Sequence, residues 1–121
     1  MKRTYIELLG ERHPLCFSLS AVEEITDAFG GMEGMTEALK NGTQAEKLKA
    51  AVKVLDILIR AGRRYCAAAG EELPPPIRGE ISDIIDATDP ASISAIFAAI
   101  NADGKREIEA KSKNADPTQD R

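Results

Sequence analysis

The sequence predicts a mainly α-helical protein with a short N-terminal β-hairpin, an α+β arrangement of about five helices around one core. The first observation is composition: the 121 residues are 43% apolar but only 4% aromatic, and there is no Trp. A core of Ile, Leu, Val and Ala favours helix packing, because strands are enriched in aromatic and β-branched residues. The second is periodicity: apolar residues recur at helical spacing over most of the chain, and only the N-terminus alternates as a strand does.

The hairpin is expected over residues 3–17. Its first half alternates between apolar and polar residues, so successive side chains face opposite sides. Gly10 and Pro14 mark the turn, a loop of about four residues that contains His13. A two-stranded hairpin is only marginally stable in water, so it has to lie on the helices or pair with another copy of the chain.

The first two helices are expected over residues 20–29 and 33–40. Ser20 and Glu23 fit a capping box, in which the serine caps the first turn and the glutamate reaches back to it. Gly30 and the glycine after it end the first helix, because glycine adopts the left-handed cap conformation without steric cost.

The helix over residues 43–69 has the strongest pattern. Thr43 and Glu46 form a second capping box, and Gly70 follows the last helical residue. The apolar stripe between these ends is wide, which predicts a central helix that other elements contact from several sides.

Two further helices are expected after a stiff proline-rich connector that begins at Leu73. Residues 77–86 place four isoleucines on one helical face. Asp89 is then a suitable N-cap, and Pro90 fits the first position of a helix that continues to residue 100.

A single domain is therefore expected over residues 1–104, followed by a polar tail over residues 105–121 that is expected to be disordered. The net charge of −4 argues against binding to nucleic acid, which normally requires a basic face. No apolar run approaches the roughly 20 residues that span a bilayer, and the N-terminus lacks the apolar part of a signal peptide. The protein is accordingly expected in the cytoplasm, without a membrane partner.

The sequence predicts no catalytic, cofactor-binding or metal-binding residues and therefore no enzyme. His13 is the only histidine; a surface position in the turn is preferred over a catalytic pair with Cys16. Cys16 and Cys66 are expected to be buried thiols. Three acidic pairs are interpreted as solvated surface groups rather than metal or acid–base sites: Glu23 with Asp27, Asp83 with Asp86, and Glu71 with Glu72.

Six residues in two groups are candidates for binding a partner protein. The first group is three arginines near the end of the long helix, which either compensate the helix dipole or form a basic patch for an acidic partner. The second lies where the first two helices meet; packing in the core is the preferred interpretation, and an adaptable apolar binding surface is the alternative. The six residues are Phe29, Met32, Met35, Arg60, Arg63 and Arg64.

The N-terminal third also carries a family resemblance. After the hairpin, residues 15–25 read Leu-Cys-Phe-Ser-Leu-Ser-Ala-Val-Glu-Glu-Ile, followed by Phe29-Gly30-Gly31 and the helix Met-Glu-Gly-Met-Thr-Glu-Ala-Leu. This resembles the tail assembly chaperones of long-tailed bacteriophages and prophages, in which a small strand pair precedes an Ala-x-x-Glu-Ile helix that ends at Phe-Gly. The similarity covers about residues 4–40; the rest agrees in length, helix content and its polar tail.

The resemblance implies a role without catalytic residues. Such chaperones bind the long helical tape measure protein and keep it soluble before the tail tube assembles around it. They tend to self-associate, and many are also made in a longer form by ribosomal frameshifting.

The alternative hypothesis is a small helical DNA-binding or antitoxin-like regulator. The arginines near residue 60 and the helix–turn–helix spacing around Gly30 favour it, whereas the acidic balance and the lack of a basic recognition helix count against it. The third hypothesis is an enzyme subunit or a small hydrolase, which would depend on His13 and Cys16.

Overall fold

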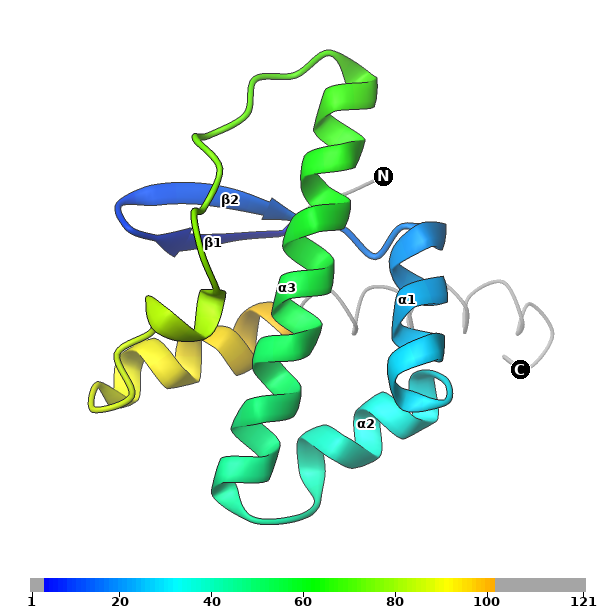
Figure 1. The fold of residues 1–121 in the computed structure, drawn as a ribbon, viewed down its shortest axis with the longest axis vertical. Helices are drawn as coiled ribbons and strands as arrows, with labels where there is room; N and C mark the ends of the chain where they lie inside the picture. Colours follow the sequence, from blue (N-terminus) through cyan, green and yellow to red (C-terminus); the bar gives the residue numbers. More distant parts are fainter. Residues whose placement is uncertain (1–3, 102–121) are drawn as a thin grey trace, which may run out of the picture.

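The structure, a computed structural model, describes residues 4–101. This part of the chain is a mixed α+β fold, as the sequence predicts (Figure 1). In chain order the elements are β1 (Thr4–Leu8), β2 (Glu11–Leu15), α1 (Leu19–Phe29), α2 (Met32–Lys40), α3 (Gln44–Ala69) and the short 3₁₀ helix η1 (Ile81–Asp83). Residues 90–101 are helical as well.

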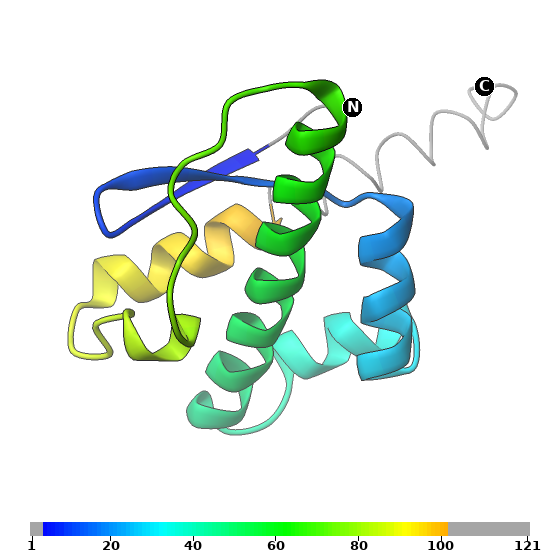
Figure 2. The same cartoon turned by 45° about the horizontal axis from the view of Figure 1, so that its top comes forward.

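Helix α3 is the central element: β2, α1, α2 and η1 all contact it. Figure 2 shows the hairpin and residues 90–101 on one side of α3 and α1 on the other. The core is aliphatic, as the composition predicts, and both Cys16 and Cys66 are buried, also as predicted. The largest fully buried apolar side chains are Leu15, Ile25, Leu55, Leu58, Ile96 and Ile100.

Strands β1 and β2 pair antiparallel through a two-residue turn at Leu9 and Gly10. Both residues have positive φ, 54° and 78°, as a type I′ turn requires. The predicted loop up to Pro14 is therefore wrong: His13 and Pro14 lie inside β2. A leucine rarely adopts positive φ, so this Leu–Gly pair does not stand out as a turn in the sequence.

The hairpin comes very close to the backbone of α3 at Gly62. A Cβ atom there would overlap the carbonyl oxygen of Pro14 and lie 2.6 Å from its carbonyl carbon. Nearby, the backbone N–H of Cys16 donates to the carbonyl oxygen of Leu58 at 3.3 Å. The end of β2 thus rests directly on the backbone of α3, with no side chain of Gly62 between them.

Helix α1 begins earlier than predicted, because Ser18 and not Ser20 is its N-cap. Ser18 has an extended backbone, and its Oγ accepts from the N–H of Ala21 at 3.3 Å. Ser20 lies within α1, where its Oγ accepts from Arg64. Gly30 ends α1 with a φ of 83°, as predicted, and α2 follows almost immediately.

Helix α3 has the ends that the sequence predicts. The Oγ1 of Thr43 accepts from the N–H of Glu46 at 3.1 Å, and the Oε1 of Glu46 accepts from the N–H of Thr43 at 2.8 Å. This complete capping box and the left-handed Gly70 delimit a helix of 26 residues.

The predicted helix over residues 77–86 is wrong, since only the three residues of η1 are helical there. Gly79 has a φ of 85° and Glu80 is extended, so the chain turns instead of continuing a helix. Burial of the apolar side chains did not require the helix, because four isoleucines of this segment pack in or against the core: Ile77, Ile81, Ile84 and Ile85. The described residues accordingly contain four α-helices where about five were expected.

The last described helix begins as predicted. Its first residue is Pro90, and the Oδ1 of Asp89 accepts from the N–H of Ala91 at 3.1 Å. The predicted tail over residues 105–121 lies outside the described residues.

Replacing Gly62 by Ala is expected to lower the free energy of unfolding by about 2–3 kcal/mol, because the new Cβ overlaps backbone atoms of β2. In an unconstrained helix the same change would raise stability by about 1 kcal/mol, so the sign is diagnostic. Urea unfolding measures it. Ala68→Gly, at the exposed end of α3, is the control for helix propensity alone and should cost about 1 kcal/mol. A stabilised Gly62→Ala protein would contradict the close approach.

Replacing Leu9 by Asn is expected to stabilise the protein by about 1 kcal/mol, because asparagine tolerates positive φ at lower cost than leucine. Leu9 is 69% exposed, so the change sacrifices little packing. Leu19→Asn is the matched control: it removes a leucine of similar exposure, 75%, from a helical position. Equal effects of both substitutions on the thermal midpoint would show that the turn conformation at Leu9 is not strained.

Candidate functional site

Two of the candidate arginines connect α3 to α1. Nη1 of Arg60 lies 2.8 Å from Oε1 of Glu24, and Nη2 of Arg64 lies 3.0 Å from its Oε2. Arg60 also pairs with Asp56 one turn before it in α3, at 3.1 Å. The hydrogen bond from Arg60 is the main cause that lowers the pKa of Glu24. Both guanidinium groups therefore have carboxylate partners within the chain, which leaves little free positive charge for a basic patch.

The third candidate arginine holds the proline-rich connector. Nη1 of Arg63 donates to the carbonyl oxygen of Pro74 at 2.8 Å, and its side chain is half-buried. Arg63 thus fixes the path of the chain after α3.

The apolar candidates lie at the α1–α2 junction, at different depths. Met35 is 5% exposed and belongs to the core, as the preferred interpretation predicted. Phe29 and Met32 are half-buried and pack against that core. Only these two retain surface that a partner can reach without rearrangement of the helices.

His13 is not in a surface turn, contrary to the prediction. It is 1% exposed, because its place in β2 opposite Ile6 turns it toward the core. Its Nδ1 has no hydrogen-bond partner among residues 4–101. Burial lowers the pKa of His13, and the positive charge of Arg63 lowers it further, so the ring is neutral at physiological pH. Cys16, its suggested catalytic partner, is fully buried.

Most of the acidic residues singled out in the sequence are exposed, and no group of three or more His, Cys, Asp or Glu among the described residues is arranged to hold a metal ion. Similarly, no helix within residues 4–101 combines the length and apolar character needed to cross a membrane.

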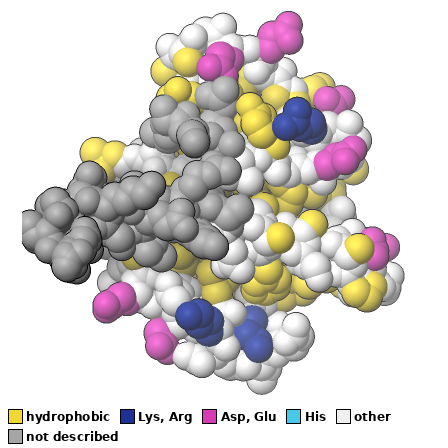
Figure 3. Space-filling model, turned by 180° about the vertical axis from the view of Figure 1, so that it is seen from behind, with side chains coloured by type: hydrophobic (Ala, Val, Ile, Leu, Met, Phe, Trp, Pro, Cys, Tyr) yellow, Lys and Arg dark blue, Asp and Glu magenta, His cyan; other side chains and the backbone are white. Residues whose placement is uncertain are grey.

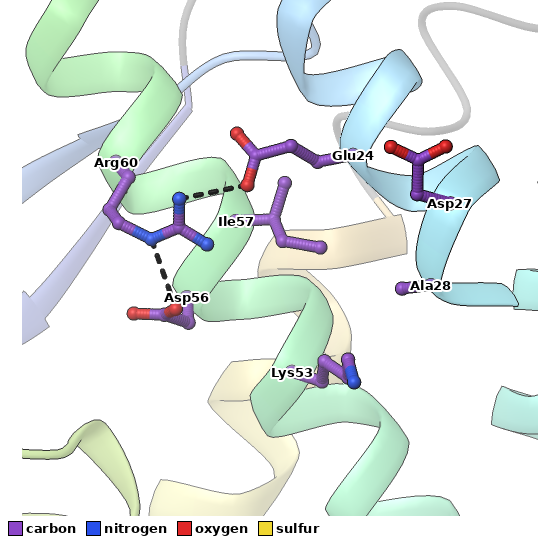
Figure 4. Close-up of a pocket in the computed structure, with 7 residues that line it drawn as sticks. All are labelled: Glu24, Asp27, Ala28, Lys53, Asp56, Ile57 and Arg60. Atoms are coloured by element: carbon purple, nitrogen blue, oxygen red, sulfur yellow. Dashed lines mark hydrogen bonds and ion pairs between the residues drawn. The ribbon is translucent and has the colours of Figure 1, made fainter.

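A cleft of about 330 Å³ lies between α1 and α3 and opens to solvent; we call it the α1–α3 cleft (Figure 4). Its lining combines three carboxylates, two cationic groups and two apolar residues. The lining residues are Glu24, Asp27, Ala28, Lys53, Asp56, Ile57 and Arg60.

Of the six candidate residues, only Arg60 lines the α1–α3 cleft. The pairing of Arg60 with Asp56 has a local signal, since oppositely charged residues four apart on a helix meet. Glu24 lies 36 residues away from Arg60 in the sequence, and no local pattern predicts their contact. From the sequence, Asp27 is interpreted only as part of an acidic pair with Glu23. Of these two residues, Asp27 lines the cleft and Glu23 does not.

No protein-family model matches the chain, and no curated protein or solved structure shows significant similarity to it. The likeness to tail assembly chaperones therefore depends on the residues quoted from about positions 4–40.

The lowered pKa of His13 predicts that the protein becomes less stable as the pH falls below about 6.5. Above the ordinary value of 6.5 its contribution is fully present; below that value the unfolded chain takes up a proton that the folded protein does not, so stability is lost toward the lowered pKa. Urea midpoints at about pH 7.5 and about pH 5.5 measure the loss. His13→Gln cannot titrate and should lose less stability over the same interval; an identical loss in both proteins would assign the effect to other groups.

Proposed function

We propose that the protein is a non-enzymatic tail assembly chaperone, which binds a tape measure protein in the host cytoplasm and keeps it soluble until the tail tube assembles. Self-association belongs to the same proposal. The observation that supports it is a set of features that follow one another over about residues 4–40. They are a hairpin, a helix of the Ala-x-x-Glu-Ile type, Phe-Gly-Gly and a Met-containing helix. The elements β1, β2, α1 and α2 occur in the order that this resemblance implies.

The accessible apolar surface supports a protein partner. Phe29 and Met32 remain partly exposed where α1 meets α2, and Leu19 at the start of α1 is 75% exposed. On the face shown in Figure 3, apolar side chains reach the surface in several places beside charged ones. A flexible Met side chain beside a partly exposed Phe suits a chaperone, which has to adapt to a helical client without retaining it permanently.

The DNA-binding alternative receives less support. In a helix–turn–helix arrangement α2 would be the recognition helix, but it carries Glu33 and Glu37 against a single Lys40. Phosphate contacts require free cations, and Arg60 and Arg64 already pair with Glu24.

Co-expression with tape measure fragments from the neighbouring open reading frames, followed by affinity capture, tests the proposal. We expect a long helical fragment to be retained and its aggregation to be suppressed. Met32→Asp should reduce the retention, because it places a charge in the partly exposed apolar surface. Glu33→Gln, at the next position but on the exposed side of α2, is the matched control and should leave retention unchanged.

A different result would favour the regulator. If no fragment is retained, while the protein stays soluble alone and shifts promoter DNA in a manner that weakens steeply with salt, the chaperone proposal is wrong.

A further inference from the structure

The α1–α3 cleft is closed on one side by an ion-pair network and floored by apolar atoms. Arg60 joins Glu24 of α1 to Asp56 of α3 across this side, as the dashed lines in Figure 4 show. Ile57 lies between the two helices, and Ala28 adds a second small apolar surface. Ile57 is 4% exposed, so the cleft offers a small apolar floor beside charges that are already paired.

The other side of the cleft presents two opposite charges that have no partner in the part of the chain that the structure describes. Asp27 on α1 and Lys53 on α3 both line the cleft and are exposed, and neither forms an ion pair or hydrogen bond with any of residues 4–101. Figure 4 shows their side chains on the side opposite to Arg60. Because Arg60 is engaged, these two groups are the charges of the cleft that remain for a partner.

The size and shape of the cleft indicate what kind of partner fits it. A volume of 330 Å³ is at the low end of the roughly 300–1,000 Å³ of small-molecule sites, and the cleft is open rather than enclosed. Its lining on α3 runs from Lys53 to Arg60, which is about 10 Å along the helix axis, or two helical turns. Protruding side chains on two turns of a partner helix match this length.

We infer that the α1–α3 cleft binds an amphipathic helix of the partner protein through one apolar anchor residue flanked by a basic and an acidic residue. The anchor lies on Ile57 and Ala28, the basic side chain pairs with Asp27, and the acidic side chain pairs with Lys53. This assignment rests on the proposed function, in which the client is a long helical protein, and specifies where and in which orientation it binds.

The mixed charge of the cleft disfavours other occupants. A metal ion would meet Lys53 and Arg60 beside the carboxylates, and a phosphate backbone would meet three carboxylates. Charge pairs formed at the rim of a helix-binding groove mainly set orientation and association rate, and the small apolar floor adds contact for one anchor residue.

The test measures binding of the shortest retained tape measure fragment to the purified full chain by fluorescence anisotropy. Ala28→Phe fills the cleft and should abolish binding. Asp27→Lys and Lys53→Glu should each weaken binding about fivefold by placing like charges opposite each other. The Asp27→Lys/Lys53→Glu double variant should recover affinity for a fragment in which the charges flanking the anchor are exchanged.

Two matched controls separate local from general charge effects. Glu23→Lys on α1 and Lys49→Glu on α3 make similar charge changes at exposed positions outside the cleft and should leave binding unchanged. Circular dichroism and urea unfolding establish that each variant is folded.

Each other outcome overturns a stated part. If the wild-type protein binds the fragment and the cleft variants bind it equally well, while Met32→Asp does not, the cleft assignment fails and the chaperone proposal stands. If the cleft variants instead change the sedimentation coefficient and leave fragment binding intact, the cleft is an interface between copies of this chain. Absence of binding by the wild-type protein overturns the proposed function, and with it the helical partner assigned to the cleft.

Discussion

The packing of the hairpin and of α1 around α3 depends on the contact between the end of β2 and the backbone of α3 at Gly62. Only a residue without Cβ lets the carbonyl group of Pro14 come so close. This approach also allows the backbone hydrogen bond from the N–H of Cys16 to the carbonyl oxygen of Leu58. Ser18 caps α1 two residues later, so the docking of β2 also fixes where α1 starts. Helix α1 then lies beside α3, close enough for Glu24 to join the arginines of α3. The α1–α3 cleft is thus a consequence of a backbone contact at some distance from it.

Helix ends were the most predictable feature, because their causes are local in the sequence. Thr43 and Glu46 satisfy each other's backbone groups within one turn, and Asp89 caps a helix that Pro90 opens. The signals that failed involve competition with other parts of the chain. Ser20 fits a capping box, but the N-cap is Ser18, which follows the hairpin more closely. Ser20 instead accepts a hydrogen bond from Arg64 of α3. A pattern of apolar spacing likewise cannot distinguish a helix over residues 77–86 from irregular backbone that buries the same isoleucines.

The candidate site was less predictable than the fold, since charge in a sequence carries no information about its distant partner. Three arginines within five residues suggest a basic patch, yet one carboxylate on α1 takes up two of them and a connector carbonyl takes the third. His13 shows the same limitation: its burial follows from a hairpin register set by the unusual backbone of Leu9. Each assignment required a contact between segments far apart in the chain.

In the proposed function, a shallow cleft that receives one apolar anchor residue would give weak binding, and weak binding is appropriate for a chaperone. A contact of two helical turns buries far less than the roughly 1,600 Å² of a standard stable interface, so a single copy releases its client readily. The long helical client of the proposed function would offer many equivalent positions, and self-associated copies would raise the effective concentration at each of them. Retention then depends on the number of copies bound together, whereas each individual contact stays reversible. Under the proposed chaperone function, assembly of the tail tube would therefore displace the copies one after another, without any step that has to break a tight interface.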